Sequence, residues 1–207
     1  MKRLVDIVIS LIALILLSPI FFIVMYKVRN NLGSPIFFLQ ERPGLNGKIF
    51  KMIKFRSMKD AVDKNGHPLP DEERITPFGH KLRSTTLDEM PQLINVLKGD
   101  MSIVGPRPQL CEFMDHYTPE QMRRHEVKPG MTGLAQVSGR NNLSWEEKFA
   151  LDVQYVDRKS ILFDFKIMFK TVQVMLNKEG INAPDQAVGA SRFSSSDNVD
   201  SKSSPNS

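Results

Sequence analysis

Apolar side chains dominate the beginning of the chain. The run from Leu4 to Tyr26 is 23 residues long and carries a single charge, Asp6. As one helix this run would be about 34 Å long, enough to cross a hydrocarbon core of about 30 Å. A cleaved signal peptide is the alternative, but no small-residue cleavage pattern follows the run. We therefore predict a membrane segment over residues 1–31.

A proline interrupts this run. Pro19 follows Ser18 and removes a backbone hydrogen bond, and the Ser18 hydroxyl is placed to bond the freed carbonyl. Basic residues flank the run on both sides, at Lys2, Arg3, Lys27 and Arg29. Cations concentrate on the cytoplasmic side, so the pattern fits a helix that breaks at Ser18-Pro19 and returns to the same face; it fits a kinked ordinary span equally well. Asp6 is expected to form an interfacial ion pair with the first two cations.

Two short segments rich in β-branched and aromatic residues, 34–40 and 48–55, are typical of strands. The dipeptides Pro43-Gly44 and Asn46-Gly47 lie between them and are strong turn signals. These segments are predicted to form a β-hairpin. Residues 60–74 are polar and are predicted to form a surface loop.

Several later segments have helical patterns. Residues 91–98 carry an apolar stripe that ends at Gly99, a typical helix stop. Residues 145–156 are predicted to be helical, opened by a capping box of Ser144 and Glu147.

Residues 119–126 are also predicted to be helical, whereas 128–140 contain three glycines and a proline and are predicted to be loop or strand. Residues 164–178 have apolar side chains at i, i+3, i+4, i+7, i+10 and i+11. Such a stripe most often packs in the core, but its phenylalanines, methionines and flanking lysines also suit a helix in a membrane surface. The predicted class is α+β, mainly helical with a small β-hairpin, a re-entrant membrane segment and surface amphipathic helices.

Composition excludes some classes of function. The net charge of +5 is compatible with any anionic partner. The single cysteine, Cys111, excludes an internal disulfide framework and a zinc site built on several thiolates. One tryptophan and three tyrosines give little stacking surface, so we predict no nucleic-acid partner. Residues 183–207 are serine-rich and predicted to be a disordered tail, which leaves 32–182 as the folded domain.

Two adjacent carboxylates, Asp88 and Glu89, precede the helix predicted over residues 91–98. Acids at a helix start are favoured by the helix dipole, so capping by Thr86 and Glu89, or by Asp88 itself, is the simpler interpretation of the local pattern.

Three cations favour a functional interpretation of these acids. Lys54 ends a predicted strand, Arg83 lies five residues before Asp88, and Arg107 lies beside Pro108 in a rigid corner. Arginine forks suit phosphate oxygens. Carboxylates among cations next to a membrane therefore indicate a diphosphate that a metal ion and arginines neutralise.

Five strings in sequence order resemble the bacterial sugar transferases, specifically the small monotopic phosphoglycosyl transferases. They are Gln40-Glu41-Arg42-Pro43-Gly44, Lys54-Phe55-Arg56-Ser57-Met58, Leu87-Asp88-Glu89-Met90-Pro91-Gln92-Leu93, Gly99-Asp100-Met101-Ser102-Ile103-Val104-Gly105-Pro106-Arg107-Pro108 and Lys128-Pro129-Gly130-Met131-Thr132-Gly133-Leu134-Ala135-Gln136. With the N-terminal segment, the resemblance extends from Lys2 to about Glu179.

The resemblance implies an enzyme that begins lipid-linked glycoconjugate synthesis at the cytoplasmic face of the bacterial inner membrane. It would move a sugar 1-phosphate from a UDP-sugar to undecaprenyl phosphate and release UMP, with downstream glycosyl transferases using its product. Membrane phospholipid would surround the N-terminal segment, and residues 32–182 would be the cytoplasmic catalytic domain.

The resemblance also implies roles for particular residues. Asp88 matches the family's nucleophile and Glu89 its partner acid, with Mg²⁺ at this pair. The positions associated with substrate or phosphate contacts are Lys54, Arg83, Arg107 and Pro108. Ser18 and Pro19 match the break in a re-entrant membrane helix, which favours the re-entrant path over the kinked span.

Two other functions remain as alternatives from the sequence. A non-catalytic membrane-anchored module would bind anionic lipid or nucleic acid through its basic surface, weakly at high salt and without need of Asp88 or Glu89. An inverting glycosyl transferase would move the sugar alone and release UDP instead of UMP. The sequence does not identify the sugar.

Overall fold

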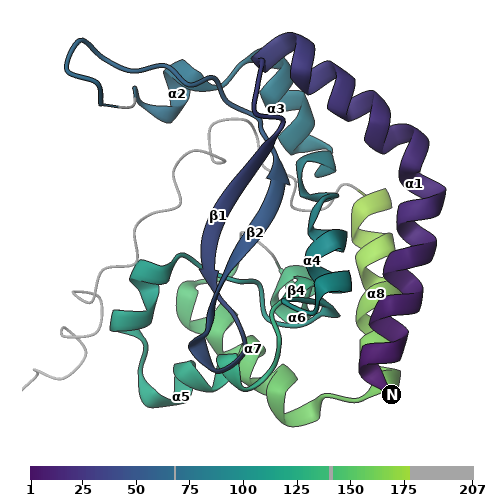
Figure 1. Cartoon of the computed structure of the whole chain (residues 1–207). Coiled ribbons are helices and arrows are strands. Elements are labelled where there is room, and N and C mark those ends of the chain that lie inside the picture. Colours follow the sequence, from purple (N-terminus) through teal and green to yellow (C-terminus); the bar gives the residue numbers. More distant parts are fainter. Residues whose placement is uncertain (68, 140–141, 178–207) are drawn as a thin grey trace, which may run out of the picture.

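The computed structural model describes residues 1–67, 69–139 and 142–177. Helices surround two small sheets, which confirms the predicted α+β class (Figure 1). The tail predicted at residues 183–207 and the end of the predicted 32–182 domain lie outside the described residues. In chain order the helices and strands are α1 (Lys2–Leu32), β1 (Phe37–Pro43), β2 (Ile49–Phe55), α2 (Asp71–Arg74), α3 (Pro77–Ser84), α4 (Gln92–Lys98), β3 (Ser102–Val104), α5 (Pro119–Met122), β4 (Gly130–Thr132), α6 (Leu134–Ser138), α7 (Trp145–Arg158) and α8 (Ile161–Leu176).

The predicted hairpin is confirmed. Strands β1 and β2 pair antiparallel, with Phe37 opposite Phe55 and Pro43 opposite Ile49. In the turn, Asn46 and Gly47 have φ angles of 53° and 74°, a left-handed conformation that these residue types tolerate best.

A second, parallel sheet joins β3 to β4, with Ser102 opposite Gly130. The two strands approach so closely near Gly105 that a Cβ on Gly130 would lie 2.1 Å from the Gly105 nitrogen. The prediction of loop or strand for 128–140 is therefore right at β4 but wrong at α6. The glycines predicted to prevent a helix there lie at its two ends instead.

The other predicted helices are present. Helix α4 ends at Gly99, whose φ is 94°, and α7 opens with the predicted Ser144–Glu147 capping box. The predicted helix over 119–126 is α5 followed by a 3₁₀ turn over Arg123–Glu126. The predicted surface loop over 60–74 contains one helical turn, α2.

Helix α1 runs along one side of the molecule and bends over its top (Figure 1). It is long and apolar enough to cross a membrane. The helix continues through Pro19, and the Ser18 hydroxyl donates a hydrogen bond of 2.8 Å to the Ile15 carbonyl, the group that loses its donor to the proline. The re-entrant path stays a prediction.

The start of α1 is fastened to the domain by an acid. Asp6 is 4% exposed and accepts hydrogen bonds from the Ser102 hydroxyl (2.9 Å) and the Ile103 N–H (3.0 Å). The expected ion pair with Lys2 or Arg3 is therefore wrong, because the carboxylate points inward to β3, and both cations have other partners.

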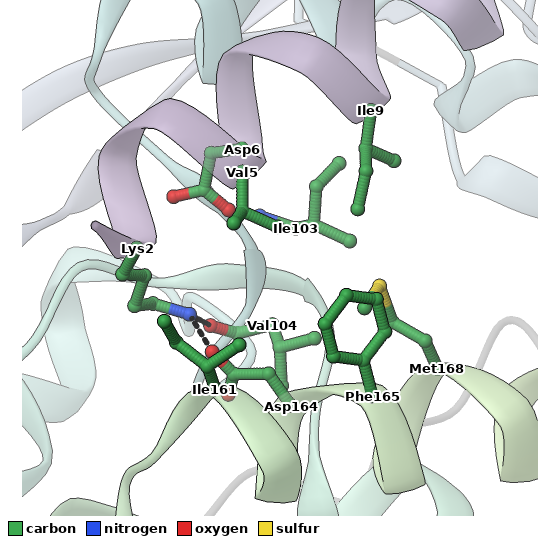
Figure 2. A pocket seen from close by; sticks show the side chains of 10 residues that line it. All are labelled: Lys2, Val5, Asp6, Ile9, Ile103, Val104, Ile161, Asp164, Phe165 and Met168. Carbon is green, nitrogen blue, oxygen red and sulfur yellow. Dashed lines mark hydrogen bonds and ion pairs between the residues drawn. The ribbon is translucent and has the colours of Figure 1, made fainter.

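These cations complete what we call the N-terminal clamp: Lys2, Arg3 and Asp6. The Lys2 amino group donates to Asp164 (2.6 Å) and to the Val104 carbonyl (3.1 Å), beside a hollow between α1 and α8 (Figure 2). Arg3 donates to carbonyls at the end of α4, including that of Leu97 at 2.7 Å. The clamp thus joins α1 to β3, α4 and α8.

The expectation that the stripe of α8 packs in the core is wrong. Five members of the stripe are exposed, among them Phe169 at 67% and Leu176 at 77%. The opposite face packs inward through Ile167 and Val174. The exposed face fits the alternative, a helix in a membrane surface, and the middle of α1 exposes apolar residues as well.

Replacing Asp6 by Ala should lower the free energy of unfolding by about 1–3 kcal/mol, because it leaves the hydroxyl of Ser102 and the N–H of Ile103 without an acceptor. Unfolding in detergent micelles measures this change. Asp115→Ala is the control, since Asp115 is exposed and makes no hydrogen bond or ion pair among the described residues. Equal losses in the two variants would contradict the role of the clamp.

Candidate active site

Asp88 and Glu89 lie in a 3₁₀ turn, Leu87–Glu89, between α3 and α4. Both are only 8% exposed. Capping is the wrong interpretation, because the side chain of Thr86 makes no cap bond and α4 begins after Pro91 without a side-chain cap. Thr86 has a φ of 60°, a strained conformation for a β-branched residue; such strained residues cluster at functional sites.

Glu89 is held by two of the predicted cations. Lys54, on β2, lies 2.9 Å from its Oε1, and Arg107 donates to Oε1 at 2.5 Å and to Oε2 at 3.2 Å. Burial by itself would raise the pKa of Glu89, but the charges of Arg107 and Lys54 outweigh it and hold the pKa well below its usual range. Glu89 is therefore ionised throughout the physiological range.

The environment of Asp88 has the opposite effect. Burial, and then the negative charge of Glu89, raise the pKa of Asp88 to about 6, although Lys54, Arg83 and Arg107 oppose the rise. Its carboxylate makes no hydrogen bond or ion pair within the described part of the chain. At neutral pH Asp88 is thus mostly ionised, and within the described residues neither of its carboxylate oxygens is engaged by another group.

The other predicted residues lie at different distances from this pair. The Arg83 Nε donates to the Ser57 hydroxyl at 2.9 Å, and its charge acts on Asp88. Pro108 is buried in the corner beside Arg107, and its carbonyl accepts a contact of 3.4 Å from Arg42. Ser18 and Pro19 lie in α1, and within the described residues neither forms a hydrogen bond or ion pair with the acids.

The sequence analysis missed a buried arginine behind the site. The Arg124 side chain is 1% exposed and donates to the Arg107 carbonyl (2.7 Å), to Asp152 (2.7 Å) and to the Tyr117 hydroxyl (2.6 Å). One signal was present in the sequence: Asp152 interrupts the apolar face of α7 between Phe149 and Val156, which indicates a buried cationic partner.

The carboxylates suit a magnesium ion better than zinc. Among the described residues, no group of three His, Cys, Asp or Glu side chains could hold a metal. Asp88 offers two oxygens, whereas those of Glu89 already face cations. Mg²⁺ is commonly bound through one or two carboxylates, with water and substrate phosphate completing its shell, so this donor set fits it.

Comparison with known proteins identifies the family. The profile described as bacterial sugar transferase matches residues 1–178. The uncharacterised sugar transferase EpsL of Bacillus subtilis (strain 168) is 50% identical, over 97% of this chain and 99% of that protein. The undecaprenyl-phosphate galactose phosphotransferase of Salmonella typhimurium is 39% identical, over 87% of this chain and 41% of that protein. The UDP-glucose:undecaprenyl-phosphate glucose-1-phosphate transferase of Klebsiella pneumoniae is 42% identical, over 83% of this chain and 39% of that protein.

The chain is therefore a transferase enzyme. The chain is a member of the bacterial sugar transferase family, as the five strings predicted.

Asp88→Asn should stabilise the protein at pH 7.5, by up to about 3 kcal/mol, since two pKa units correspond to about that much. Because the pKa of Asp88 is higher in the folded protein than in the unfolded chain, the folded protein binds this proton more tightly. The ionised aspartate therefore lowers the free energy of unfolding fully above pH 6 and not at all below the unfolded pKa near 4. Unfolding of both proteins from pH 7.5 down to pH 4.5 tests this. An advantage of the variant that grows toward low pH would contradict the assignment.

Arg124→Met should destabilise the protein by about 3–5 kcal/mol, because it leaves the buried Asp152 without its cation. The double variant Arg124→Met/Asp152→Leu removes both charges and should recover much of this loss. Denaturant unfolding compares the two. No recovery in the double variant would mean that the ion pair is not the origin of the effect.

Proposed function

We propose that this chain transfers a sugar 1-phosphate from a UDP-sugar to undecaprenyl phosphate at the cytoplasmic face of the inner membrane, and that UMP is released. One observation carries the proposal: Asp88 is a mostly ionised carboxylate without a partner among the described residues, directly beside a Glu89 that two cations hold in place. The names of the relatives from Salmonella and Klebsiella support the lipid acceptor and a sugar-phosphate product.

Asp88 is the proposed nucleophile. One of its carboxylate oxygens attacks the sugar-linked phosphorus of the donor, and the bond from that phosphorus to the oxygen bridging the diphosphate breaks. UMP leaves with the electron pair, and an aspartyl phosphosugar remains. An oxygen of the lipid phosphate then attacks the same phosphorus, and the aspartyl–phosphorus bond breaks to restore the Asp88 carboxylate. No base is needed, because the attacking groups are already anionic.

The main obstacle to the first step is electrostatic, since a carboxylate has to approach a negatively charged diphosphate. Arg107 keeps 44% of its side chain exposed while it holds Glu89, so its guanidinium is accessible to phosphate oxygens. Arg83 and Lys54 add positive charge around Asp88. Mg²⁺, held by Asp88 with Glu89 nearby, would neutralise further phosphate charge.

The membrane surface explains how the second substrate reaches the site. A polyprenyl phosphate keeps its chain in the bilayer and its phosphate at the interface, so the nucleophile has to lie close to that interface. The exposed apolar faces of α1 and α8 supply membrane contact on one side of the domain (Figure 1).

Purified protein with undecaprenyl phosphate, Mg²⁺ and a panel of UDP-sugars should release UMP from at least one donor, and Asp88→Asn should lower the rate at least 1,000-fold, in line with loss of a covalent nucleophile. Without acceptor, mass spectrometry should find a sugar-phosphate adduct on Asp88. The control is Asp115→Asn, which should keep full activity.

Three results would contradict the proposal. UDP as the product would indicate transfer of the sugar alone. Full activity in Asp88→Asn would show that Asp88 is not the nucleophile. No turnover with any donor would favour a non-catalytic module.

A further inference from the structure

A second arginine lies beside the Arg107 corner and forms no ion pair with any acid in the described part of the chain. Arg42, near the end of β1, contacts the Gln40 amide oxygen (2.7 Å) and, at 3.4 Å, the Pro108 carbonyl. No carboxylate lies within ion-pair distance of it in the described residues. Its Nε is buried and has no hydrogen-bond partner among the described residues, as is also the case for the Nε of Arg124.

This arrangement is costly for a structural arginine. Burying a guanidinium without a counterion carries an energetic penalty, and a second cation nearby adds repulsion. Burial, and then the charge of Arg107, lower the pKa of Arg42 to about 10, although the charge of Glu89 opposes this, so the two guanidinium groups act on each other. By contrast, the buried Arg124 has Asp152 as its counterion.

The surroundings of Arg42 favour an anion as the missing partner. A small hollow lies beside Pro43, the neighbour of Arg42 in sequence. Arg107 and Pro108 line it together with the buried Arg124 and His125, whereas Arg42 itself does not line it. Arg42 reaches this corner through its contact with the Pro108 carbonyl, next to Arg107. Two neighbouring guanidinium groups offer several N–H donors, which suits the oxygens of a phosphate.

We propose that Arg42 binds a phosphate group of a substrate together with Arg107. The inference rests on the proposed function for the identity of the substrate, and either the phosphate that leaves in UMP or the phosphate of undecaprenyl phosphate meets its chemistry. Arg42 is then a binding residue that gains a directly contacting anion when substrate arrives.

Equilibrium binding tests this without turnover. Pyrophosphate, UMP, uridine and undecaprenyl phosphate in detergent micelles are titrated into wild type, Arg42→Met, Arg42→Lys and the control Lys51→Met. Lys51 is an exposed cation on β2 of the same hairpin, so its variant removes an equal charge away from the hollow.

Arg42→Met should weaken binding of pyrophosphate and of one phosphate substrate 10- to 100-fold, since a charged hydrogen bond contributes about 1.5–3 kcal/mol. If the variant binds UMP more weakly but uridine equally well, Arg42 contacts the nucleotide phosphate. If it binds undecaprenyl phosphate more weakly, Arg42 contacts the phosphate of the acceptor. Arg42→Lys should recover part of the binding, and Lys51→Met should change it less than 3-fold. The melting temperature of Arg42→Met should stay equal to wild type or rise.

Wild-type affinity of Arg42→Met for all of these phosphates would overturn the inference, as would a lower melting temperature with unchanged binding, which would make Arg42 structural. The test also separates this inference from the proposed function. If phosphate binding depends on Arg42 but no UDP-sugar releases UMP, the transfer reaction is contradicted and the phosphate site is still supported. A wild type that binds none of the phosphates would contradict both.

Discussion

The ion pairs of Glu89 are the interaction on which the site depends. They join Lys54 of the β-hairpin, the turn before α4 and Arg107 of the corner after β3, three segments distant in sequence. Because the two cations keep the pKa of Glu89 well below its usual range, this junction is equally charged at every physiological pH. Arg124 then fixes the backbone of the same corner through the Arg107 carbonyl. The geometry around Asp88 is therefore set before any substrate binds.

Two neighbouring carboxylates acquire different properties through this junction. Glu89 takes the direct contacts of the cations, and its own charge then helps burial to raise the pKa of Asp88 to about 6. A carboxylate with this pKa is more basic than an ordinary aspartate and is still mostly ionised at pH 7, which suits a nucleophile. Glu89 is held by its cations, whereas Asp88 has no such direct contact among the described residues, although both occupy the same buried turn.

The sequence predicted the elements whose signals are local. Turn dipeptides marked the hairpin, Gly99 marked the end of α4, and Ser144 with Glu147 marked the start of α7. Predictions failed where a distant partner decides the outcome. Asp6 faces Ser102, 96 residues away, instead of its helical neighbours. Local spacing also made capping the simpler interpretation of Asp88 and Glu89, because the cations that bind Glu89 come from other segments. The stripe of α8 has helical spacing, but spacing does not distinguish a face that meets the core from one that meets a membrane.

The N-terminal clamp connects the position of the anchor to the site. Asp6 bonds the Ile103 N–H and Lys2 bonds the Val104 carbonyl, and Arg107 follows three residues later in the same rigid segment. Arg3 bonds carbonyls at the end of α4, the helix that begins just after the turn of Asp88 and Glu89. Both segments that carry the site are thus held by the first turns of α1. A flexible tether would leave the first turns of α1 free to move relative to the domain, whereas these short contacts fix α1 relative to the segments that carry Asp88 and Arg107.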